Sequence, residues 1–78
     1  LIIEDDLTVS ELLDQFLMNN GFTTAFASDG YEGLLQFEKE HPSLVLLGLM
    51  LPKLDGIQTC REIRKISNVP IIFMSFKA

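Results

Sequence analysis

The fold of this chain is decided by residues 44–52, which read Leu44-Val45-Leu46-Leu47-Gly48-Leu49-Met50-Leu51-Pro52. This stretch indicates a buried strand over residues 43–49 that opens into a loop before Pro52. Apolar and polar residues do not alternate in it, so we expect both faces of the strand to be covered, as in a parallel sheet. Gly48 stands at the end of this strand, and the candidate functional residues described below also follow the ends of strands.

Strand-like segments alternate with segments that have helical periodicity along the whole sequence. We predict strands over residues 1–3, 22–27, 43–49 and 70–75. The helices between them begin at capping pairs three residues apart, namely Thr8 with Glu11, Asp29 with Glu32, and Asp55 with Gln58. The order β-α-β-α-β-α-β predicts an α/β fold with a parallel sheet and right-handed crossovers.

We expect the large apolar residues of each helix to form its buried face. These residues are Val9, Leu12, Leu13, Phe16 and Leu17 in the first helix, Tyr31, Leu34, Leu35 and Phe37 in the second, and Ile57, Cys60, Ile63 and Ile66 in the third.

Length and composition limit the classes of function. The chain has 78 residues, enough for one small domain, and a formal net charge of −5. This charge argues against a nucleic-acid or anionic-membrane surface on this segment, because such surfaces need clustered Lys and Arg. The single cysteine, Cys60, excludes an internal disulfide and fits a reducing compartment. With neither a membrane-spanning apolar run nor a signal peptide, we expect the cytoplasm as the location.

Polar or special residues follow three of the predicted strands: the triplet Glu4-Asp5-Asp6, then Gly48, then Ser75. Ligands of open α/β sheets bind at this carboxyl edge. Neighbouring carboxylates repel each other and need a cation or a proton, and carboxylate oxygens with waters suit Mg²⁺. The alternative is that the triplet only caps the turn and favours the positive end of the helix dipole.

Three segments together resemble the receiver domain of two-component response regulators: residues 1–6 (LIIEDD), 46–56 (LLGLMLPKLDG) and 70–75 (PIIFMS). The resemblance covers the whole chain, with the motifs in the family's order. It implies a flavodoxin-like, doubly wound sheet, here with strand order 2-1-3-4. It also implies a sensor histidine kinase as partner, which donates a phosphoryl group to an Asp at the end of the third strand with the help of Mg²⁺.

The roles that the resemblance implies are only partly filled. Glu4 and Asp5 match the acidic metal-binding pair, Met50 matches the residue whose backbone carbonyl completes the metal site, and Ser75 matches the hydroxyl that senses the phosphoryl group. Gly48 stands where the family has the phosphoacceptor Asp. We therefore expect no aspartyl phosphorylation at this position, and weak or absent Mg²⁺ binding.

Two further departures from the family lie near the end of the chain. Phe76 follows Ser75 where the family has a small residue, so we expect its ring to block the site by packing over Gly48. Residues 1–78 match only the N-terminal portion of a receiver, without the fifth strand and the last helices. We therefore expect the strand at residues 70–75 to form an open edge, through which the chain makes a homodimer or a domain swap.

The leading interpretation is a receiver that cannot be phosphorylated, a pseudo-receiver. Residues 49–52 and 60–64 are similar to the subfamily with a winged-helix DNA-binding domain, so the parent would be a transcription regulator. One alternative is an interaction module that works without phosphate, and another is an engineered receiver fragment. A Mg²⁺-dependent phosphatase-like enzyme is the weakest, because the nucleophile is missing. We therefore expect no enzymatic activity.

Overall fold

The structure is a computed structural model and describes residues 1–75. The elements alternate strictly between strand and helix, which confirms the predicted order. They are β1 (Ile2–Ile3), α1 (Leu7–Asn19), β2 (Phe26–Ala27), α2 (Gly30–Glu40), β3 (Val45–Gly48), α3 (Gly56–Arg64) and β4 (Ile71–Met74).

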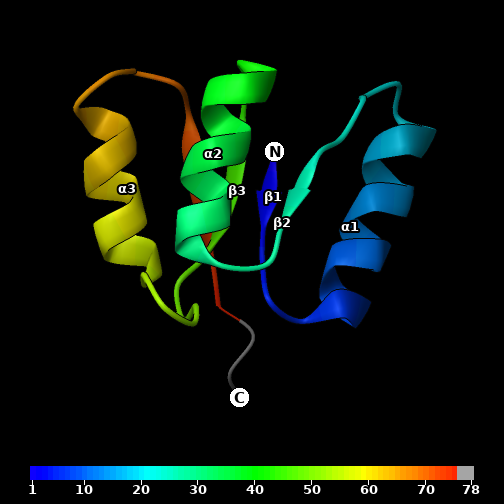
Figure 1. The fold of residues 1–78 in the computed structure, drawn as a ribbon. Coiled ribbons are helices and arrows are strands. Elements are labelled where there is room, and N and C mark those ends of the chain that lie inside the picture. The colour runs from blue at the N-terminus through cyan, green and yellow to red at the C-terminus, as the bar shows by residue number, and fades with distance from the viewer. Residues whose placement is uncertain (76–78) are drawn as a thin grey trace.

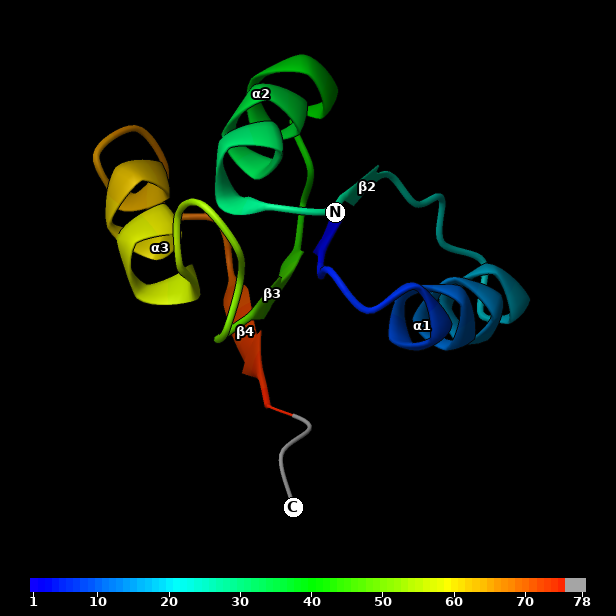
Figure 2. The ribbon, with the colours of Figure 1, turned by 60° about the horizontal axis from the view of Figure 1, so that its bottom comes forward.

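The four strands form one parallel sheet in the order β2-β1-β3-β4. This order confirms the expected flavodoxin-like, doubly wound arrangement. Figure 2 shows α2 and α3 together on one face of the sheet and α1 on the other. The second strand is shorter than the predicted residues 22–27. Since β1 is only two residues long, its ladder pairs with Phe26 and Ala27 alone.

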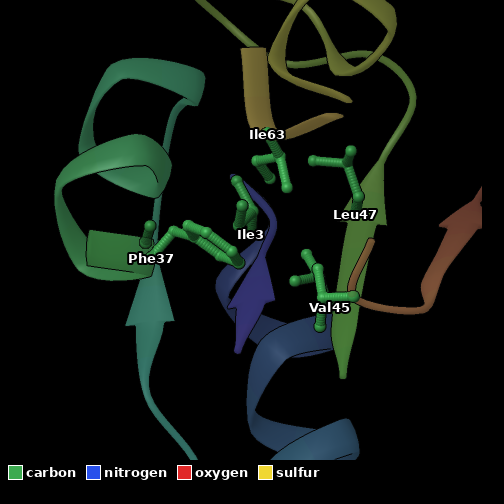
Figure 3. Packing of buried hydrophobic residues seen from close by; sticks show 7 residues of the cluster. Ile3, Phe37, Val45, Leu47 and Ile63 are labelled. Carbon is green, nitrogen blue, oxygen red and sulfur yellow. The ribbon is translucent and has the colours of Figure 1, made fainter. Parts of the chain in front are cut away.

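The hydrophobic core lies between the sheet and the layer of α2 and α3. Figure 3 shows Ile3, Val45 and Leu47 of the strands pointing toward Phe37 of α2 and Ile63 of α3. All five side chains are buried. Val45 and Leu47 thus account for the apolar residues of the stretch 44–49 that face the layer of α2 and α3.

The expected buried face of α2 is wrong in part. Tyr31 and Leu35 are exposed, whereas Gly30, Gly33 and Phe37 form the stripe that faces the core. Glycine in this stripe lets the helix approach the sheet closely, because a Cβ on Gly33 would lie 2.7 Å from Cδ1 of Ile3. The contact of α2 with the core is therefore made by its glycines and by the ring of Phe37.

The other two helices depart from the expectation in the same way. On α3 the buried residues are Gly56, Thr59 and Ile63, while Ile57 is exposed and Cys60 is half-buried. Ile66 lies beyond the end of α3 and is exposed. On α1, Val9, Leu13 and Leu17 are half-buried, while Leu12 and Phe16 are exposed. A helix touches the sheet along a narrower stripe than its apolar residues would cover.

Side-chain caps start the helices, as expected for α2 and α3. Asp29 accepts a hydrogen bond from the Glu32 N–H at 2.9 Å, and Asp55 accepts one from the Gln58 N–H at 2.8 Å. The predicted cap of the first helix, Thr8, is wrong. The N-cap is Asp6, whose Oδ1 accepts from the backbone N–H of Thr8 at 2.9 Å.

No helix within residues 1–75 is both long enough and apolar enough to cross a membrane.

Candidate functional site

The carboxyl ends of β1, β3 and β4 meet at one edge of the sheet, the lower edge in Figure 1. Pairing of Ile3 with Leu47 places Glu4 beside Gly48, because each is the next residue along its chain. Gly48 in turn pairs with Met74, the residue before Ser75. Parallel register therefore brings together residues that lie more than 25 positions apart in the sequence.

A cleft of about 280 Å³ opens at this edge. Its walls come from the turn after β1, the first turn of α1, the loop after β3 and the end of β4. The lining residues are Glu4, Asp5, Asp6, Val9, Leu49, Met50, Met74 and Ser75. The structure thus gathers Glu4, Asp5, Met50 and Ser75, which the sequence had singled out, around one hollow.

Gly48 is buried at the end of β3, and the space where a side chain would start is already taken. A Cβ built on Gly48 would lie 2.5 Å from Oε1 of Glu4, 3.1 Å from Cδ2 of Leu51 and 3.3 Å from the carbonyl oxygen of Ile3. The other carboxylate oxygen of Glu4, Oε2, accepts a hydrogen bond from the Asp6 N–H at 2.9 Å. Sequence reasoning placed Glu4 in the site but missed this position over Gly48.

The electrostatics of the acidic triplet differ from residue to residue. Glu4 is buried, with 8% of its surface exposed, whereas Asp5 and Asp6 are exposed. Burial raises the pKa of the Glu4 carboxyl above its ordinary value; the hydrogen bond from the Asp6 N–H opposes this, and the neighbouring Asp5 adds to it. Asp6 caps α1, as the capping interpretation expects, while Glu4 lines the cleft; the metal-binding interpretation stays a prediction.

The carboxylates of this cleft do not make a full metal site. Mg²⁺ takes near-octahedral oxygen coordination and is held through carboxylates. Glu4, Asp5 and Asp6 line the cleft and Gly48 supplies no carboxylate; one oxygen of Glu4 and one of Asp6 accept hydrogen bonds from backbone N–H groups. Within residues 1–75 the structure contains no group of three or more His, Cys, Asp or Glu side chains that could hold a metal ion.

The loop between β3 and α3, which carries Met50, is fastened to the helices. The Gly56 N–H donates to the Leu49 carbonyl at 3.1 Å, and the buried hydroxyl of Thr59 donates to the Asp55 carbonyl at 2.8 Å. Gly56 leaves no room for a side chain, because its Cβ would lie within 2.2 Å of the Gly48 carbonyl oxygen. The loop geometry therefore depends on Gly56 and Thr59, which sequence reasoning did not connect with the site.

The same loop is tied to α2 by an ion pair. Nζ of Lys53 lies 3.5 Å from Oδ2 of Asp29, and Lys53 adopts the left-handed backbone conformation with φ of 67°. The pKa of Asp29 is held below its ordinary value, chiefly by the bond from the Glu32 N–H and also by the charge of Lys53. Asp29 was predicted only as a helix cap, and nothing local in the sequence pairs it with Lys53.

Phe76 lies outside the described residues, so its packing over Gly48 stays a prediction. Among the described atoms, Oε1 of Glu4 is the nearest to the place where a Cβ of Gly48 would be.

The fold and the cleft define the class: an α/β domain with a parallel sheet and an acidic site at the carboxyl ends of its strands. The family described as the response regulator receiver domain matches residues 1–78, the whole of the chain. The chain belongs to this family.

Curated relatives agree with this assignment. The chain is 45% identical over 75 residues to the probable transcriptional regulator ycf27 of Porphyridium aerugineum, which covers 96% of this chain and 31% of that protein. It is 42% identical over 77 residues to the uncharacterized transcriptional regulatory protein YclJ of Bacillus subtilis (strain 168), covering 99% of this chain and 34% of that one. The chain thus spans about a third of the length of these relatives.

Solved structures place the fold in the same family. The BeF3-activated N-terminal receiver domain of RstA from Klebsiella pneumoniae matches with a TM-score of 0.91 and 31% identity, over 99% of this chain and 67% of that one. The receiver domain of the sensor histidine kinase PA1611 from Pseudomonas aeruginosa PAO1 matches with a TM-score of 0.88 and 28% identity, over 95% and 63%. That structure has a magnesium ion coordinated in its active-site cleft.

Proposed function

We propose that this chain is a receiver unit of a transcription regulator that takes no phosphoryl group at the end of β3. The observation that carries the proposal is the position of Gly48 beside Glu4 and near Ser75. By the resemblance to the family, this is the phosphoacceptor position. The names of the relatives support the transcriptional role, and a winged-helix DNA-binding domain would lie outside this segment. On this proposal the unit acts by binding and is not an enzyme.

Chemistry supports the loss of phosphorylation. Transfer to a receiver needs a nucleophilic carboxylate oxygen in line with the phosphorus and positive charge to stabilise the transferring group. Gly48 has no side-chain oxygen, and of the three carboxylates that line the cleft Glu4 accepts a backbone hydrogen bond and Asp6 caps α1. Ser75 would keep its position as the sensing hydroxyl, but it would have no phosphoryl group to sense.

Intact-mass spectrometry after incubation with a small acyl phosphate donor and Mg²⁺ tests the proposal. We expect the mass of the chain to stay unchanged, whereas the RstA receiver domain, treated in parallel, shows that the donor is competent. A stoichiometric phosphoryl adduct on this chain would overturn the proposal. Peptide mapping of such an adduct would identify the residue that had replaced the missing acceptor.

A sensor histidine kinase is the partner that membership of the family implies, and binding in place of phosphotransfer is the second candidate function. An exposed apolar pair on α1 supports it, because Leu12 and Phe16, about one helical turn apart, are 64% and 66% exposed. Exposed apolar patches of this kind mark interaction surfaces. Equal affinity of a kinase for this chain with and without the acyl phosphate donor is the expected result; an increase with the donor contradicts it.

The edge of the sheet at β4 supports self-association. Among residues 1–75, β4 is the last strand in the order β2-β1-β3-β4, and Ile72 and Phe73 on it are exposed. An open apolar edge favours pairing with another strand, so we infer a dimer or domain swap through β4. Sedimentation should show a dimer that Ile72→Lys converts to a monomer. A monomer at all concentrations would refute the inference.

A further inference from the structure

The Glu4 carboxylate occupies the space beside Gly48, and this affects the site in addition to the missing acceptor oxygen. Its Oε1 lies 2.5 Å from the place where a Cβ on Gly48 would be, which is closer than real Cβ contacts. Its Oε2 is held by the Asp6 N–H at 2.9 Å, and the whole residue is 8% exposed. Glu4 therefore points into the space that a side chain at residue 48 would use, and it is fastened there.

The other closely packed glycines of the chain differ from Gly48 in the kind of atom that a Cβ would meet first. A Cβ on Gly56 or Gly30 would first meet a backbone carbonyl oxygen, and one on Gly33 would meet the buried side chain of Ile3. Only at Gly48 is the nearest atom the end of a flexible, charged side chain. The backbone itself is no obstacle, since Gly21 is the glycine with positive φ in the described chain. The severe obstacle to a side chain at residue 48 is thus one movable carboxylate, beside the milder contacts with Leu51 and Ile3.

We propose that Glu4 makes a space-filling contact in this cleft that couples residue 48 to the turn between β1 and α1. Its carboxylate occupies the place of the side chain that Gly48 lacks, and any group placed there must first displace Glu4 from the Asp6 N–H. The inference rests on the proposed function only in taking residue 48 as the acceptor position. Restoring an acceptor would therefore require both an Asp at residue 48 and an outward movement of Glu4.

The displaced side chain has somewhere to go. Glu4 already lines the cleft of about 280 Å³, so its carboxylate can rotate away from residue 48 and stay within the cleft. Movement also reaches α1, because Asp6 donates its N–H to Glu4 while its side chain caps the helix through the Thr8 N–H. Occupancy of residue 48 is thereby coupled to the hydrogen bonding of the turn between β1 and α1.

Gly48→Ala tests the contact directly, because a methyl group supplies the Cβ and nothing else. Amide hydrogen exchange by NMR reports on the Asp6 N–H, which donates to Glu4. We expect this amide to exchange about fivefold faster in Gly48→Ala, the ratio for loss of one typical hydrogen bond. An unchanged Asp6 amide in a folded Gly48→Ala variant would overturn the proposal.

Gly48→Ala is compared in the unchanged chain and in a Glu4→Asp variant. This comparison separates the effect of the Glu4 contact from a general loosening of the turn between β1 and α1. Glu4→Asp is one methylene shorter, so its carboxylate no longer reaches residue 48. In that background Gly48→Ala should leave the Asp6 amide unchanged, and an equal acceleration there would refute the inference. If Gly48→Ala does not fold, Glu4→Ala combined with Gly48→Ala should restore folding, because the conflicting carboxylate is gone; failure of that rescue counts against the contact.

The two proposals fail independently. A phosphoryl adduct on the unchanged chain would refute the proposed function but leave the exchange result at Asp6 as it is. An unchanged Asp6 amide in Gly48→Ala would refute the contact of Glu4 while Gly48 still lacks an acceptor oxygen.

Discussion

Gly56→Ala should destabilise the domain strongly, although alanine is ordinarily the better residue in a helix. The new Cβ would lie 2.2 Å from the Gly48 carbonyl oxygen and 2.9 Å from Cα of Leu49, where ordinary contacts begin at 3.4 Å. Both neighbours are backbone of β3 and its loop, so neither can rotate away. The helix start must instead move by more than 1 Å, which loosens the hydrogen bond from the Gly56 N–H to the Leu49 carbonyl.

The magnitude follows from these three effects. Overpacking costs about 1–3 kcal/mol, and a weakened hydrogen bond about 0.5–1.5 kcal/mol. The higher helix propensity of alanine returns up to about 1 kcal/mol. We expect a net loss of about 2–3 kcal/mol in the free energy of unfolding. For a domain of 78 residues this is a large share of a total of about 4–12 kcal/mol.

Urea unfolding followed by circular dichroism measures this loss. With a slope of about 1–2 kcal/mol per molar urea, the midpoint should fall by about 1–3 M. Gly48→Ala is the matched control, because its Cβ meets the flexible end of Glu4 first and should cost clearly less. Equal midpoints for Gly56→Ala and the unchanged chain would refute the argument that close backbone packing requires glycine here.

Further predictions concern helix packing, capping and pH. Ile63→Ala should cost about 2–5 kcal/mol because Ile63 is fully buried, whereas Ile66→Ala, on a side chain 61% exposed, should cost less than about 0.5 kcal/mol; the reverse order in thermal unfolding would contradict the core assignment. Asp6→Ala should destabilise by about 0.5–2 kcal/mol and Thr8→Ala hardly at all, and equal losses would mean that Asp6 is not the cap. Asp29→Asn should be less stable than the unchanged chain at neutral pH. Because the folded-state pKa of Asp29 is lowered, its contribution is complete above the ordinary value of 3.8 and is lost as the pH falls through the folded-state pKa, so the two unfolding curves should converge in acid.

Much of the fold could be predicted because its signals are local. The caps at Asp29 and Asp55 and the unalternating strand around Leu47 depend on residues within a few positions of one another. The alternation of strand and helix then allows few topologies, and a parallel sheet follows. The cap of the first helix was misplaced because Thr8 and Asp6 both satisfy local capping rules, and only the backbone geometry of the turn selects Asp6.

The candidate site could be predicted as a set of residues but not as an arrangement. Strand ends identify Glu4, Gly48 and Ser75, since parallel strands end at one edge. The direction in which Glu4 turns could not be predicted, because it depends on the Asp6 N–H and on the space over Gly48. The buried residues of the helices were also predicted poorly, because their burial depends on how each helix packs on the sheet.

The sequence by itself determined the order of elements, the parallel sheet, the receiver family and the lack of a side-chain oxygen at Gly48. Only the tertiary structure decided that Glu4 fills the place of the missing side chain and that glycines, rather than large apolar residues, carry much of the helix–sheet contact. The physical reason is distance along the chain. Periodicity and capping act over a few residues, whereas Glu4 and Gly48 meet only when β1 pairs with β3.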